Sequence, residues 1–146
     1  MTFFICGDII HTESFAKESE KMGFWIFMLV IDLLIPLTMI GFGRLFLKKI
    51  PKDINALFGY RTSMSMKNAE TWEFAHKYCG RIWFVGGLVM LPLSIIPLLF
   101  FIGGDEDTVS AVGSIVAFVQ MIPLIGAIFP TEAALKKNFD GNGKRR

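Results

Sequence analysis

Residues 82–102 read IWFVGGLVMLPLSIIPLLFFI and carry no charge. A helix needs about 20 apolar residues to cross the hydrocarbon core of a bilayer, which is about 30 Å thick. Two further stretches reach this length, at about residues 23–47 and 111–130. Buried helices of a soluble protein are the alternative, but three such stretches among 146 residues leave too little polar surface for a soluble fold. The sequence therefore predicts an all-α membrane protein with three transmembrane helices.

The composition agrees with this prediction. Hydrophobic residues make up 53% of the chain and charged residues 19%, below the quarter or so that is usual in soluble domains. The length fits one membrane domain over residues 1–146. No basic surface interleaved with aromatic residues is evident, so the sequence predicts no direct contact with nucleic acid.

The positions of Lys and Arg predict the orientation, because cytoplasmic loops of membrane proteins carry an excess of both. Seven basic residues lie in the segment 48–81, and five lie after residue 131. The turn at residues 103–107 reads GGDED and has no basic residue, and the N-terminal segment has only Lys17 and Lys21. We therefore expect segment 48–81 and the C-terminus in the cytoplasm, and the N-terminus outside.

Asp32 is the polar residue that is most costly to place within the predicted spans, because a carboxylate at the bilayer centre costs about 2.5–3.5 kcal/mol on insertion scales. Counting residues from the end of each span that lies at the outer membrane face puts Gln120 and Ser94 at about the same depth. We expect the three side chains to form one hydrogen-bonded layer, with Asp32 protonated. This layer either fixes the packing of the helices or binds a proton, an ion or a polar ligand group.

The segment 48–81 is the predicted cytoplasmic part between the first two spans. After a loop that contains Pro51, a helix is expected with Ser65 or Asn68 as its N-cap. Apolar residues then recur at three- and four-residue steps, which predicts an amphipathic helix lying along the membrane surface. Gly80 marks the expected turn into the second span.

The amino-acid sequence of this segment resembles the signature of the SdpI family of membrane proteins. The matching residues are Phe58-Gly59-Tyr60-Arg61-Thr62-Ser63, Met66-Lys67-Asn68, Glu70-Thr71-Trp72 and Ala75-His76-Lys77-Tyr78-Cys79-Gly80. The chain departs from the family pattern at Ser63, where proline is usual, and at His76, where asparagine is frequent.

This resemblance implies a function in the cytoplasmic membrane of a bacterium. The named member of the family is an immunity protein that protects the cell from a secreted peptide toxin and holds a transcriptional repressor at the membrane. It is longer than this chain. The resemblance implies partner-binding or signature roles for Gly59, Tyr60, Arg61, Thr62, Lys67, Asn68, Glu70 and Trp72. Arg61 suits a carboxylate or a lipid phosphate, and Glu70 or Glu73 is an alternative partner within the chain.

The sequence leaves two other classes of function to compare with immunity. An enzyme is not predicted, because the sequence has no metal-spaced His or Cys cluster, nucleophile elbow or phosphate-binding loop. No cofactor or metal is therefore expected. The alternative is a small oligomeric transporter or a proton- or ion-conducting protein that uses Asp32. Small residues in the third span, such as Gly113 and Ala117, favour close packing on a helix of the same chain or of a second copy.

Overall fold

The computed structural model describes the backbone of residues 2–50, 54 and 59–146, with side chains from residue 13 onward within these ranges. The described chain forms four helices, α1 (Thr2–Lys48), α2 (Ala69–Leu99), α3 (Glu106–Gly126) and α4 (Ile128–Asn138). Three stretches are long and apolar enough to cross a membrane, namely Glu13–Lys48, Ala69–Leu99 and Glu106–Asn138. The prediction of an all-helical chain with three such segments is confirmed.

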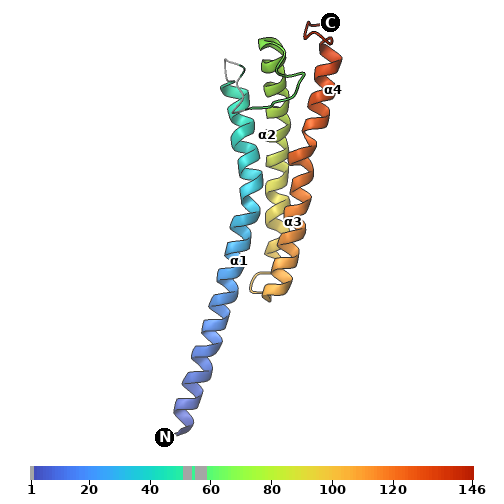
Figure 1. The fold of residues 1–146 in the computed structure, drawn as a ribbon. Coiled ribbons are helices and arrows are strands. Elements are labelled where there is room, and N and C mark those ends of the chain that lie inside the picture. Colours follow the sequence, from blue (N-terminus) through green and yellow to red (C-terminus); the bar gives the residue numbers. More distant parts are fainter. Residues whose placement is uncertain (1, 51–53, 55–58) are drawn as a thin grey trace.

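The helices α1, α2 and α3 lie side by side, and α4 continues roughly along the direction of α3 (Figure 1). The third apolar stretch is thus made of two helices that meet at Ala127, four residues after Pro123. The C-terminus lies at the same end of the bundle as the end of α1 and the start of α2 (Figure 1). We call this the signature end, defined by residues 44–50, 59–81 and 127–146.

Three glycines bring α1 and α2 into close contact. A Cβ on Gly43 would lie 2.5 Å from the backbone N of Phe84, and one on Gly87 would lie 2.8 Å from the carbonyl oxygen of Pro36. Gly80 faces Phe46 in the same way, with 2.8 Å between the added Cβ and the Cβ of Phe46. Small residues of this kind let helix backbones approach closely. Gly113, one of the small residues singled out in the third span, likewise packs closely on a helix of the same chain, because a Cβ added to it would clash with the Met28 side chain of α1.

At the opposite end, α2 and α3 are joined by a short turn that includes residues 100–105. Asp105 caps α3 by accepting a hydrogen bond from the backbone N–H of Thr108 at 2.9 Å. The Trp25 indole N–H donates to the carbonyl oxygen of Leu98 at 2.8 Å and so ties α1 to this end of α2. A small apolar cluster of Trp25, Leu98 and Val109 fills the space between the three helices.

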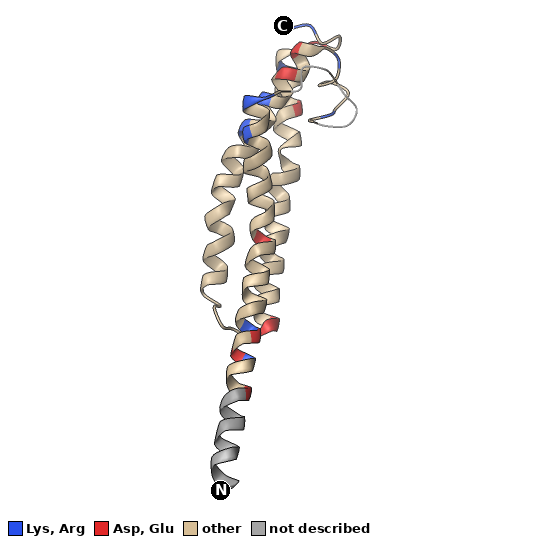
Figure 2. Cartoon of the chain, turned by 90° about the vertical axis from the view of Figure 1, so that its left-hand side faces the viewer, with Lys and Arg blue, Asp and Glu red and all other residues tan. Residues whose placement is uncertain are grey.

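Charged residues gather at the two ends of the bundle, and the middle is largely free of them (Figure 2). The described side chains of the middle are mostly apolar, and many of them are exposed, as expected of a bundle whose surroundings are lipid; Phe118 and Ile122 are examples, at 77% and 70% exposure. Asp32 is the exception among the acidic and basic residues, since it lies within α1 in this middle region and is 1% exposed. This pattern supports the membrane assignment from the structure itself.

The separate amphipathic helix predicted within segment 48–81 is not observed. Residues 69–81 are instead the first turns of α2, which continues without a break past Gly80 to Leu99. The apolar face of these turns is covered by protein: Ala75 and Cys79 belong to one buried cluster with Leu135 and Phe139. A membrane surface is therefore not needed to bury that face. Residues 51–53 and 55–58, which include Pro51, lie outside the described residues.

Candidate functional site

The segment from Gly59 to Tyr60 is held on α2 by a buried histidine. The backbone N–H of Tyr60 donates to His76 Nε2 at 3.0 Å, and His76 Nδ1 lies 2.7 Å from the carbonyl oxygen of Trp72. Nε2 accepts, so Nδ1 must carry the proton that is donated to Trp72, and the ring is neutral. His76 belongs to no metal-spaced cluster of His or Cys in the sequence, and yet its side chain joins the motif that contains Tyr60 to the motif that contains Trp72. Its position four residues after Trp72, on the same helix face, was the available signal.

Gly59 lies where no other residue fits. Its φ is +118°, in the region that L side chains rarely adopt. A Cβ there would also lie 2.2 Å from His76 Nε2 and 3.2 Å from the Trp72 ring. The backbone conformation and the close packing against His76 and Trp72 both explain why the signature has glycine at this position.

The Tyr60 side chain joins the signature segment, which we define as the described residues 59–80 that carry the family motifs, to the third apolar stretch. It is 8% exposed, and its hydroxyl donates to the carbonyl oxygen of Ile128 at 3.2 Å. Burial, followed by the negative charge of Glu132, raises the pKa of Tyr60 from 10.0 to about 12. Tyr60 therefore acts as a neutral hydrogen-bond donor.

A tight turn connects Tyr60 to the start of α2. The backbone N–H of Thr62 donates to Ser65 Oγ at 2.8 Å, and the N–H of Ser65 donates back to Thr62 Oγ1 at 3.1 Å. The Thr71 hydroxyl donates within the same region, 3.1 Å from the carbonyl oxygen of Ser65. Thr62 thus has a defined local role, and Ser65 and Thr71 are contributors that the sequence analysis did not single out as site residues.

Asn68 is the N-cap of α2, so the second of the two predicted N-caps, Ser65 or Asn68, is confirmed. Its side chain accepts from the N–H of Thr71 at 2.8 Å, and the Thr71 hydroxyl lies 3.1 Å from the N–H of Asn68. This reciprocal pair is a capping box. Asn68 Nδ2 also donates to the carbonyl oxygen of Gly143 at 2.7 Å, which fastens the C-terminal tail to the start of α2.

The charged signature residues are exposed and only partly paired. Glu70 faces Arg145 at 3.6 Å, and Glu73 faces Lys77 at 2.5 Å, so neither acidic residue holds Arg61 as the sequence analysis considered. Among the residues that the structure describes, no acidic side chain pairs with Arg61, which is exposed. Lys67 is exposed as well.

Trp72 lies in the core of the signature end. It is 1% exposed, and its ring centroid is 4.2 Å from that of His76. On the family resemblance, Trp72 and Tyr60 are expected to have partner-binding or signature roles. Both are buried, so they hold the signature segment in place from the inside, whereas Arg61, Lys67 and Glu70 present its accessible charge.

The three polar residues predicted to share a depth within the membrane do lie together. Asp32, Ser94 and Gln120 are each at most 1% exposed. Gln120 Nε2 donates to Ser94 Oγ at 2.7 Å and to the backbone carbonyl oxygen of Asp32 at 3.0 Å. The Ser94 hydroxyl in turn donates to the carbonyl oxygen of Met90 at 2.7 Å. The layer joins one residue from each of α1, α2 and α3.

The hydrogen bond to α1 is made by the backbone of Asp32 and not by its carboxyl group. Pro36 lies four residues later and has no N–H, so the carbonyl of Asp32 lacks its usual partner within the helix. Gln120 supplies that partner from α3. A proline-freed carbonyl satisfied by a neighbouring helix is the arrangement that membrane helices require.

The Asp32 carboxyl group is left without a hydrogen-bond donor among the described residues, and so is Gln120 Oε1. The carboxyl group lies against Gly113, where an added Cβ would be 3.2 Å from Asp32 Oδ2. Three buried oxygen atoms therefore accept nothing. Chemically, the site lacks donors, and a proton on Asp32 or a small ligand with N–H or O–H groups would supply them.

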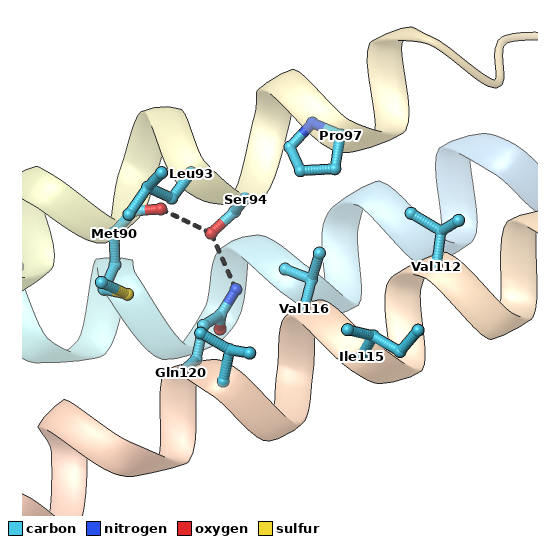
Figure 3. Close-up of a pocket in the computed structure, with 9 residues that line it drawn as sticks. Met90, Leu93, Ser94, Pro97, Val112, Ile115, Val116 and Gln120 are labelled. Atoms are coloured by element: carbon cyan, nitrogen blue, oxygen red, sulfur yellow. Dashed lines mark hydrogen bonds between the residues drawn. The ribbon is translucent and has the colours of Figure 1, made fainter.

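An apolar cavity of about 280 Å³ lies between α2 and α3 beside this layer (Figure 3). Ser94 and Gln120 are among its lining residues, and the rest of its wall is formed by aliphatic side chains such as Leu93 and Ile115, by Met90 and by Pro97. Within the described part of the chain, no three His, Cys, Asp or Glu side chains are grouped closely enough to hold a metal ion.

Comparisons with known proteins point to one family. No solved structure matches the chain. It is similar to a protein of Bacillus subtilis (strain 168) that is named "Uncharacterized protein YfhL", with 35% identity over 46 residues. That match covers 32% of this chain and 42% of the relative, less than half of either. The model of the SdpI/YfhL protein family matches residues 52–131, more than half of the chain. This chain is therefore a multi-pass membrane protein that belongs to the SdpI/YfhL family.

Proposed function

We propose that this protein is a toxin-immunity protein of the bacterial cytoplasmic membrane. Membership of the SdpI/YfhL family supports this proposal, because the matched range 52–131 includes the signature segment. The family is not known as an enzyme family, and the proposal gives the chain a binding role. In this account a secreted peptide toxin is the ligand, and a transcriptional repressor is the partner in the cytoplasm.

The signature end is the proposed docking surface for the repressor. The excess of Lys and Arg around it supports its placement in the cytoplasm, with the N-terminus outside the cell. The observation that carries the proposal is the state of Arg61. Its side chain is exposed and has no acidic partner among the described residues, although hydrogen bonds hold the segment around it in place. An unpaired guanidinium on a rigid support suits a carboxylate of a partner protein.

A survival assay tests this function. A toxin-sensitive bacterium expressing the chain is challenged with an SdpI-type peptide toxin, with Arg61→Ala and Arg81→Ala compared at matched membrane levels. We expect the parent chain and Arg81→Ala to protect the cells and to hold the repressor in the membrane fraction, and Arg61→Ala to lose most of the bound repressor. Failure of the well-expressed parent chain to protect, or full retention of the repressor by Arg61→Ala, would contradict the proposal.

A second candidate function is conduction of a proton or a small ion by an oligomer. The observation that favours it is the buried Asp32 carboxyl group without a donor, because ionisable residues within membrane segments usually mark ion or proton pathways. Proton flux into proteoliposomes separates the candidates. Flux that Asp32→Asn abolishes and Ser114→Ala retains would support conduction, and absence of flux in the parent chain would exclude it.

A further inference from the structure

A cavity at the signature end carries an inference beyond the proposed function. It has a volume of about 380 Å³, within the range of small-molecule sites. Phe46, Trp83 and Ile128 form its apolar wall, and Tyr60 and Arg61 line its polar side. Three elements therefore meet here with the signature segment: the end of α1, the middle of α2 and the start of α4.

The polar groups of the wall are already used, with one exception. The Tyr60 hydroxyl donates to the carbonyl oxygen of Ile128 at 3.2 Å, and the Trp83 indole N–H donates to that of Leu124 at 3.2 Å. Arg61 has neither a hydrogen bond nor an ion pair with the described residues. The cavity thus offers one available cation beside an apolar wall.

The apolar wall is preformed. The rings of Phe46 and Trp83 stack with centroids 5.9 Å apart and an interplanar angle of 23°. Phe46 also meets His76 edge to face, with centroids 4.9 Å apart, and His76 holds the backbone of Tyr60. A ligand entering the cavity therefore meets an ordered surface, which lowers the entropy lost on binding.

We propose that this cavity binds an anionic phospholipid, with its phosphate at Arg61 and the first part of an acyl chain against Phe46, Trp83 and Ile128. A guanidinium is weakly hydrated and matches the geometry of a phosphate. A free phosphate would leave the apolar wall uncovered, whereas a lipid covers it. Glu132, whose charge acts on Tyr60, is not part of the wall. The lipid phosphate takes the same guanidinium that is proposed for the repressor, so the two ligands would compete for Arg61; a binding test without toxin or repressor therefore tests the lipid site apart from immunity.

Quenching of tryptophan fluorescence by brominated acyl chains tests the proposal. The purified full chain is placed in bilayers that contain brominated phosphatidylglycerol or brominated phosphatidylcholine at equal fractions in both leaflets. We expect stronger quenching by the anionic lipid, and we expect Trp83→Phe to remove this difference. Since hydrogen bonds to charged groups contribute about 1.5–3 kcal/mol, Arg61→Gln should weaken the preference roughly tenfold or more.

Two further variants control for charge and for shape. Arg81→Gln removes a charge from the same end of α2 but not from the cavity wall, and it should keep the preference. Ile128→Phe fills the cavity without changing any charge and should reduce the preference; melting temperatures near that of the parent would show that both variants fold. Equal losses in Arg61→Gln and Arg81→Gln, an unchanged preference in Arg61→Gln, or displacement by added inorganic phosphate would each overturn the proposal.

Discussion

At the scale of single residues, the signature segment is a set of positions that support one another. Gly59 makes room for His76, His76 holds the backbone of Tyr60, and Tyr60 bonds to Ile128 across the bundle. The residues themselves were evident in the sequence through their resemblance to a family motif. Which of them are buried and which are exposed could not be predicted, because the burial of Trp72 and the exposure of Arg61 depend on helices that lie far away in the chain.

Gly59→Ala tests this arrangement. The variant places a Cβ at a φ of +118° and 2.2 Å from His76 Nε2. Backbone strain of this kind costs about 1–3 kcal/mol, and displacement of the histidine adds to it. We expect a lower melting temperature in detergent micelles. Gly23→Ala is the matched control, because nothing lies within 4 Å of its added Cβ; equal melting temperatures for the two variants would refute the assignment.

The ionisation of Tyr60 gives a second test. In Tyr78→Phe, Tyr60 is the remaining tyrosine, and its absorbance titration should have a midpoint near pH 12. Because the folded-state pKa is raised, the neutral hydroxyl contributes to stability fully below pH 10, and that contribution is lost as the pH rises through about 12. A midpoint at the ordinary value of a solvated tyrosine would show that Tyr60 is not buried.

At the scale of elements, the sequence predicted the three apolar stretches because uninterrupted apolar length is a local property. Their limits were less accurate: α2 begins at Ala69, well before the predicted span at residue 82. The pattern of residues 69–81 was amphipathic as expected, but periodicity does not tell a membrane surface from a protein core. Leu135 and Phe139 of the third stretch and the tail cover that face instead.

The contact between α1 and α2 gives a prediction at this scale. Gly43→Ala would place a Cβ 2.5 Å from the backbone N of Phe84, so the helices must separate. Gly41 lies two residues earlier on the same helix, and its added Cβ meets nothing within 4 Å. We expect Gly43→Ala to lower the melting temperature by several degrees and Gly41→Ala to leave it unchanged or to raise it, since Ala favours helix over Gly. Equal effects would argue against this helix contact.

At the scale of the whole molecule, polar residues are found in two kinds of place, at the ends of the bundle and in one buried layer. Charges gather at the ends of the bundle, and one layer of Asp32, Ser94 and Gln120 crosses its middle. The layer was predictable because depth follows from counting residues along straight helices. Its hydrogen bonds were not predictable, since they depend on the Asp32 carbonyl oxygen that Pro36 leaves without a partner and on the direction in which the Gln120 side chain points.

Repressor docking at Arg61 requires that the signature end face the cytoplasm. The most direct measurement is labelling of single introduced cysteines in intact cells with a membrane-impermeant maleimide, in a Cys6→Ser background that keeps the buried Cys79. Asp107→Cys should be labelled in intact cells, and Ser63→Cys only after the membrane is permeabilised. Labelling of Ser63→Cys in intact cells, with Asp107→Cys protected, would contradict the account.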